Sequence, residues 1–89
     1  MATAHLTLIG KPGCHLCDDA RGLVGSVVAK LRVDPAAPMI TFEERSILDD
    51  AELHALYLED IPVLLINGKV HNYWRIDPVR LRTALLEVS

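Results

Sequence analysis

The segment Lys11–Cys17 constrains the fold of this chain more than any other stretch, because it separates two different hydrophobic patterns. Before it, Ala4–Ile9 becomes almost continuously apolar, as a mostly buried strand does. From Leu16 to Leu31, apolar residues recur every three or four positions, which predicts an amphipathic helix with these residues on its inward face. Both cysteines of the chain, Cys14 and Cys17, lie at this junction. The sequence therefore predicts a strand and a helix joined by a short turn that carries the only two thiols.

A second strand and a second helix are expected after the turn-forming segment 34–38. Met39–Glu44 predicts the strand, with Ile47 as its furthest extent. Asp49 and Asp50 then offer N-caps for a helix. The residues of this helix expected to face inward are Leu53, Leu56 and Tyr57.

The dipeptide Asn67-Gly68 is the strongest hairpin signal in the chain. It joins the apolar run Ile61–Ile66 to Lys69–Trp74, so these two segments are expected to pair as antiparallel strands. Asp77 is then the expected N-cap of a last helix, with proline at the first helical position. The residues expected to form the buried stripe of this helix are Val79, Leu81, Leu85, Leu86 and Val88.

The predicted order is strand, helix, strand, helix, strand, strand, helix. The first two strands, joined through a helix, are expected to be parallel, whereas the last two form a hairpin. We therefore predict an α/β protein with a four-stranded mixed sheet flanked by three helices. With 89 residues, the chain is expected to form one domain, residues 1–89, around a single core.

Composition excludes several classes of partner. The net charge is −3 and the basic residues are scattered, so neither nucleic acid nor an anionic membrane is expected. No apolar run approaches the roughly 20 residues that a membrane-spanning helix needs. The first residues resemble no secretory signal, and two cysteines in such a chain suggest the reducing cytoplasm. We expect a cytoplasmic monomer.

Two segments carry a resemblance to a known family. Lys11–Cys17 resembles the active-site segment of glutaredoxins, in which a lysine precedes a dithiol pair that opens the first helix. Ile61-Pro62-Val63 resembles the loop whose cis-proline faces the cysteines in the thioredoxin superfamily. With its Pro-Gly-Cys-His-Leu-Cys motif, the chain is most similar to small glutaredoxin-like proteins. The resemblance implies a thioredoxin-like (glutaredoxin-like) fold over nearly the whole chain.

The resemblance also implies a function, that of a thiol–disulfide oxidoreductase acting on protein or glutathione disulfides. Cys14 is the expected nucleophile and Cys17 the more buried resolving thiol. Lys11 and His15 are expected to favour the thiolate, as is the helix N-terminus. No bound cofactor is expected, and glutathione is a candidate co-substrate. The expected substrate-binding residues are Ile61 and Pro62.

One region differs from typical glutaredoxins. These carry a Gly-Gly-x-Asp segment after the hairpin, which helps to bind glutathione, whereas this chain has Asn72–Asp77 there. Within it, Arg75 offers a charge for a carboxylate, and Tyr73 and Trp74 are interpreted as packing residues. Asp60 stands at a loop position where glutaredoxins have threonine.

The alternative interpretation of the cysteine pair is a metal-binding or metal-delivery module. Two thiolates suit Cu(I) or zinc, or an iron–sulfur cluster shared between two chains. A structural zinc site needs four ligands, and the nitrogen donors available to complete one are His5, His15 and His71. A third interpretation is a binding adaptor without redox activity. Metal loading and disulfide exchange are the observations that separate these three.

Overall fold

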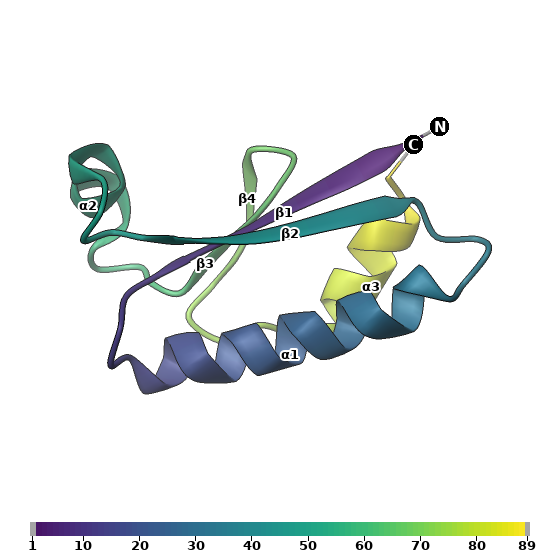
Figure 1. Cartoon of the computed structure of the whole chain (residues 1–89), viewed down its shortest axis with the longest axis horizontal. Coiled ribbons are helices and arrows are strands. Elements are labelled where there is room, and N and C mark those ends of the chain that lie inside the picture. Colours follow the sequence, from purple (N-terminus) through teal and green to yellow (C-terminus); the bar gives the residue numbers. More distant parts are fainter. Residues whose placement is uncertain (1, 89) are drawn as a thin grey trace.

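Residues 2–88, which the computed structural model describes, form four strands and three helices (Figure 1). In chain order these are β1 (Thr3–Gly10), α1 (His15–Arg32), β2 (Met39–Ser46), α2 (Ala51–Tyr57), β3 (Val63–Ile66), β4 (Lys69–Tyr73) and α3 (Pro78–Leu86). The predicted order of elements is confirmed.

The four strands form one mixed sheet in the order β2-β1-β3-β4. β1 pairs with β2 in parallel, whereas the β1–β3 and β3–β4 pairs are antiparallel. In this register Leu8 lies between Glu44 of β2 and Leu64 of β3. The parallel crossover and the hairpin predicted from the sequence are therefore both present.

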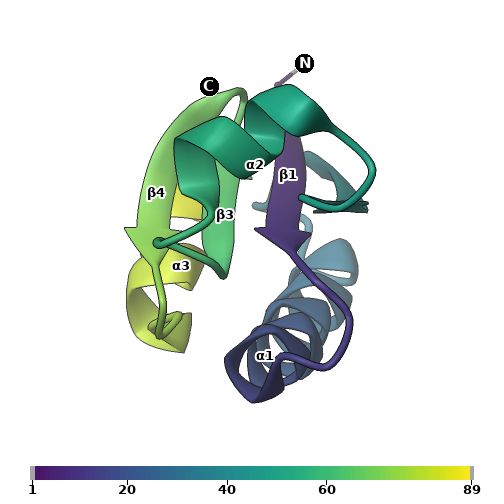
Figure 2. The same ribbon diagram turned by 90° about the vertical axis from the view of Figure 1, so that its left-hand side faces the viewer.

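The alternation of β1 divides the core between the two faces of the sheet. Ala4, Leu6 and Leu8 are buried on the face covered by α1 and α3, where they belong to the main hydrophobic cluster. Ile9 points to the other face and packs in a smaller cluster with Ile47, Val63 and residues of α2. Figures 1 and 2 show the same division, with α2 lying apart from α1 and α3. Because α2 is short, it covers only one end of the second face of the sheet, around Ile9 and Val63.

The predicted helix caps are present. The carboxylate of Asp50 accepts the backbone N–H groups of Glu52 and Leu53 at the start of α2. Asp77 does the same at the start of α3, with Pro78 in the first turn. Of the two N-caps that the sequence offered for α2, the structure therefore uses Asp50 rather than Asp49.

Four apolar residues predicted to face inward are exposed, so these predictions were wrong. Leu56 is 57% exposed because the seven-residue α2 contacts the sheet through Leu53 and Tyr57 only. In α3, Leu81 and Leu85 form the buried stripe, and residues off that stripe point to solvent. The other three exposed residues are Leu16 (38%), Val79 (74%) and Leu86 (36%).

Two strand boundaries also differ from the prediction. β3 begins at Val63 rather than Ile61, because Pro62 has no N–H to donate to a sheet ladder. β4 ends at Tyr73, since Trp74 adopts the left-handed conformation with φ of 56°. A register shift opposite Leu64 and Leu65 adds a bulge to the hairpin. None of the helices in residues 2–88 is long and apolar enough to cross a membrane.

Candidate functional site: the dithiol at the start of α1

The turn between β1 and α1 places Cys14 at the N-cap of the first helix. Gly13 has φ of +75°, a conformation that other residues adopt only with strain, and it directs the chain into the helix. Cys14 itself is extended, and its carbonyl accepts the first helical hydrogen bond, from the N–H of Asp18 (3.0 Å). The thiol therefore stands where a helix usually has a serine, threonine or aspartate side chain.

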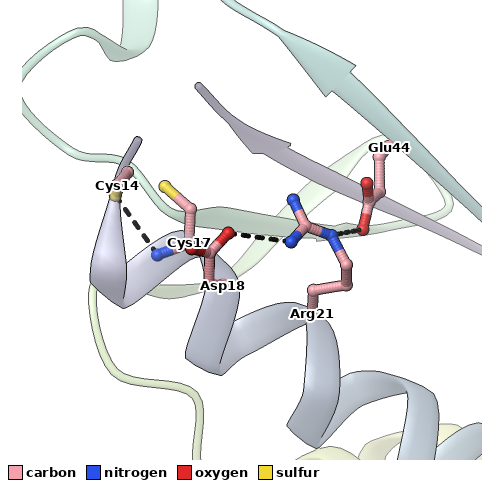
Figure 3. A network of polar contacts seen from close by, with 5 residues as sticks. All are labelled: Cys14, Cys17, Asp18, Arg21 and Glu44. Carbon is pink, nitrogen blue, oxygen red and sulfur yellow. Dashed lines mark hydrogen bonds and ion pairs between the residues drawn. The ribbon is translucent and has the colours of Figure 1, made fainter. Parts of the chain in front are cut away.

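The two cysteines are joined by a hydrogen bond from backbone to sulfur. The backbone N–H of Cys17 donates to the Sγ of Cys14 over 3.2 Å (Figure 3). The Sγ atom thus satisfies one of the N–H groups that the first turn of α1 leaves without a helical partner. This donor and the positive end of an 18-residue helix both direct positive partial charge toward the Sγ of Cys14.

Cys17 is in a different environment. It is only 2% exposed, whereas Cys14 is partly accessible. Burial, above all, raises the pKa of the Cys17 thiol to about 11. A side-chain hydrogen bond between the two thiols acts in the same direction, and a backbone hydrogen bond from Lys11 opposes it. At neutral pH Cys17 is therefore a neutral thiol beneath an accessible Cys14. The predicted difference in burial is confirmed, while the two roles remain predictions.

Gly10, the last residue of β1, makes this burial possible. A Cβ atom added to Gly10 would lie 2.8 Å from the Sγ of Cys17 and 3.1 Å from its Cβ. Both distances are too short for any residue other than glycine to fit without displacement. The sequence interpretation missed this role of Gly10. The signal that would have identified it is a glycine directly before a cysteine-containing turn.

The loop that contains Ile61 and Pro62 leads into β3 at the end of the sheet where the cysteine turn begins. Ile9 of β1 pairs with Val63 of β3, so the end of β1 and the start of β3 lie at the same end of the sheet (Figure 2). The Ile61–Pro62 peptide bond is cis, as the resemblance predicted. Pro62 is buried and Ile61 is partly exposed. The fold thus brings together the two segments that carried the resemblance, although their binding role stays a prediction.

Trp74 braces this loop, a role that the sequence interpretation missed. Its backbone N–H donates to the carbonyl of Pro62 (2.8 Å), and its indole N–H donates to the carbonyl of Glu59 (3.3 Å). The side chain is nevertheless 55% exposed, so Trp74 is not a core residue. Tyr73, beside it at 6.3 Å between ring centroids, is also exposed.

The side chains of Lys11 and His15 are both exposed. Lys11 borders a pocket of about 330 Å³ that reaches Cys17 from the side of β2. Within this pocket Arg21 of α1 binds Asp18 (2.8 Å) and Glu44 of β2, so that its guanidinium lies between two carboxylates (Figure 3). This network links α1 to β2 next to the dithiol. The influence of Lys11 and His15 on the thiolate remains a prediction.

No group of three or more metal-ligating side chains comes together within residues 2–88. Of the candidate nitrogen donors, His5 bonds through Nδ1 to Thr41 on β2. His71 lies in the bulged part of β4, where burial lowers its pKa and its Nε2 has no partner among the described residues. His15 is next to Cys14 in the sequence. A metal bound at this site would therefore rely on the two thiols.

The chain matches the family described as "Glutaredoxin-like domain (DUF836)" over residues 5–86. It is 26% identical over 82 residues to the uncharacterized protein Rv0508 of Mycobacterium tuberculosis and to Mb0520 of Mycobacterium bovis, an alignment that covers 92% of this chain and 82% of each relative.

Two solved structures are similar over most of their length. Protein XcR50 from X. campestris is 34% identical, with a TM-score of 0.63 over 90% of this chain and 93% of that one. Protein Ne2328 from Nitrosomonas europaea, at 23% identity, has a TM-score of 0.72 over 92% and 91% of the two chains, which concerns the fold alone. The predicted thioredoxin-like fold is confirmed. With its Cys-x-x-Cys pair at the start of α1 and a family match that spans residues 5–86, this chain belongs to the glutaredoxin-like domain family (DUF836).

Proposed function

We propose that the chain is a thiol–disulfide oxidoreductase that uses Cys14 and Cys17 to reduce protein or glutathione disulfides. One observation carries the proposal: Cys14 is partly accessible, and its Sγ caps α1 and accepts the N–H of a buried second cysteine. This arrangement gives the two thiols unequal character, as a nucleophile and a resolving thiol require. Family membership supports the same chemistry.

The first step is attack by the Cys14 thiolate on one sulfur of the substrate disulfide. A disulfide forms between Cys14 and the substrate, and the other substrate sulfur leaves as a thiolate that takes a proton from water. In the second step Cys17 loses its proton to solvent and attacks the Sγ of Cys14. The products are the Cys14–Cys17 disulfide and the second substrate thiol, so two electrons pass from the dithiol to the substrate. A thiol or dithiol donor then restores the reduced pair.

The high pKa of Cys17 suits this order of events. While Cys14 carries negative charge, Cys17 holds its proton and does not compete as a nucleophile. Formation of the mixed disulfide removes that charge from Cys14, so the proton of Cys17 becomes easier to lose. The resolving thiol is thereby activated only after the substrate is attached.

A reductase assay with a protein disulfide as substrate and dithiothreitol as electron donor tests the proposal. Cys14→Ser is expected to reduce the rate to that of dithiothreitol alone, because no other accessible thiol exists in the chain. Ser26→Ala, an exposed change of similar size on α1, serves as the matched control and is expected to leave the rate unchanged. A Cys14→Ser variant as active as the unaltered protein would contradict the proposal.

Two further measurements are needed. One tests whether glutathione is a co-substrate, and the other tests whether the protein binds metal instead. Incubation with oxidised glutathione, followed by mass spectrometry, is expected to give a glutathione adduct on Cys14 if glutathione is a co-substrate. Its absence would restrict the proposal to protein disulfides. Protein purified without chelator that carries stoichiometric metal, lost in Cys14→Ser, and that shows no exchange would instead establish the metal-binding alternative.

A further inference from the structure

A second pocket, of about 260 Å³, lies between the start of α1 and the segment that follows β4. Five of its seven lining residues are apolar: Leu16, Ala20, Leu23, Trp74 and Ile76. The other two, Asp19 and Arg75, are exposed and carry opposite charges. The pocket therefore has an apolar lining with one charge of each sign.

This pocket adjoins the candidate active site. Leu16 lies between the two cysteines in the sequence, and it is exposed in the first turn of α1. On the opposite wall, Trp74 donates its backbone N–H to Pro62 (2.8 Å) in the loop beside the cysteine turn. A substrate whose sulfur reaches Cys14 thus has this apolar surface next to it.

Trp74 has features that packing does not explain. It adopts a left-handed backbone conformation (φ 56°), which is rare for a bulky side chain. Backbone strain of this kind occurs preferentially at functional sites. The ring is fixed at its nitrogen by the carbonyl of Glu59, yet more than half of the residue is open to solvent. A rigidly held, exposed tryptophan is the kind of residue that contributes most to binding at protein interfaces.

We infer that this pocket binds a bulky apolar side chain next to the disulfide cysteine of a protein substrate. The inference rests on the proposed function. Moving an apolar side chain from water onto the surface formed by Leu16, Leu23 and Ile76 lowers the free energy of binding. Glutathione has no such side chain, so its charged ends could pair only with Asp19 and Arg75 and would leave the apolar lining uncovered. The pocket therefore selects protein segments with an apolar residue beside cysteine.

Two synthetic peptide disulfides, identical except for leucine or serine next to the cysteine, provide the test. The measured quantity is the rate of mixed-disulfide formation with the Cys17→Ser variant, with 2-hydroxyethyl disulfide as a reagent that is too small to fill the pocket. The leucine peptide is expected to react about 10-fold faster than the serine peptide, the lower end of the discrimination that apolar pockets achieve.

Substitutions in the pocket test whether it is the source of the preference for the leucine peptide. On the Cys17→Ser background, Trp74→Ala and Leu16→Ser are each expected to reduce the preference to about 2-fold or less. Trp74→Phe retains an apolar ring and is expected to keep most of it. Val33→Ala, a change at an exposed apolar residue at the far end of α1, is the control and should keep the full preference. Leu16→Ser keeps the test valid if Trp74→Ala fails to fold.

Equal rates for the two peptides, with normal reaction of the small reagent, would overturn this inference alone. Faster reaction of oxidised glutathione than of the leucine peptide, lost in Trp74→Ala, would show a glutathione subsite and overturn it as well. If none of the disulfides reacts with Cys14, the proposed function fails together with the inference.

Discussion

Gly10 and Cys17 are packed so closely that a Cβ atom on the glycine would lie 2.8 Å from the Sγ of the cysteine. The end of β1 and the first turn of α1 are thereby held in direct contact. Because Gly10 also accepts the backbone N–H of Ile47 through its carbonyl, its backbone is not free to move aside. The position of the buried Cys17 thiol thus depends on the absence of a side chain at Gly10, the last residue of β1.

Gly10→Ala is therefore expected to destabilise the protein by about 1–3 kcal/mol, the usual cost of inserting a methyl group into a packed interior. Chemical denaturation under reducing conditions measures this change. Gly22→Ala is the matched control, since a Cβ at Gly22 meets nothing within 4 Å, and it is expected to stabilise α1 by about 0.5–1 kcal/mol. Equal stability of the Gly10→Ala variant and the unaltered protein would show that the contact can relax.

The raised pKa of Cys17 predicts a loss of stability at alkaline pH. The unfolded thiol titrates near pH 8.5, whereas burial moves the folded value to about 11. Between these values the unfolded chain binds fewer protons than the folded one, so the free energy of unfolding falls as pH rises. Below about pH 8 the contribution is fully present.

Denaturation of the reduced protein at several pH values between 7.5 and 10.5 measures this slope. Cys17→Ser keeps a small polar side chain that does not titrate in this range, so its stability should fall less steeply than that of the unaltered protein. Other groups that titrate there are common to both proteins and cancel in the comparison. Parallel pH dependences would mean that Cys17 is not desolvated in the native state.

Two residues of α3 test the arrangement of the core. Leu81 is fully buried, while Val79, two residues earlier, is 74% exposed. Leu81→Ala is expected to cost about 2–5 kcal/mol and Val79→Ala less than about 0.5 kcal/mol. Denaturant titrations of both variants give the comparison. Similar losses in the two would place Val79 in the core, as the sequence pattern alone suggested.

The sequence predicted the fold well because its local signals agree with one another. Asn67-Gly68 adopts the two positive φ values of a tight hairpin, 51° and 81°, and Asp77 caps α3 as expected. The exposed residues Leu16 and Leu56 were predicted wrongly for a physical reason. Helical periodicity identifies the apolar side of a helix, but it does not show how far the neighbouring sheet extends over that side.

The site was predicted only in part for a similar reason. Cys14 and Cys17 could be found because their spacing is a local property of the chain. The contributions of Gly10 and Trp74 could not, since each depends on a contact with a residue distant in sequence or on a particular φ value. Trp74 directly follows β4, a strand whose bulge, opposite Leu64 and Leu65, has no clear signal in the sequence.

The most direct test of the central claim is to trap the mixed disulfide. Cys17→Ser, incubated with a disulfide-containing protein and analysed by non-reducing mass spectrometry, is expected to accumulate a covalent adduct on Cys14, because the thiol that would release it is absent. Cys14→Ser is expected to form no adduct, since its remaining thiol is buried and protonated. An adduct on Cys17 in the Cys14→Ser variant, or none in either, would contradict the assignment of Cys14 as nucleophile and Cys17 as resolving thiol.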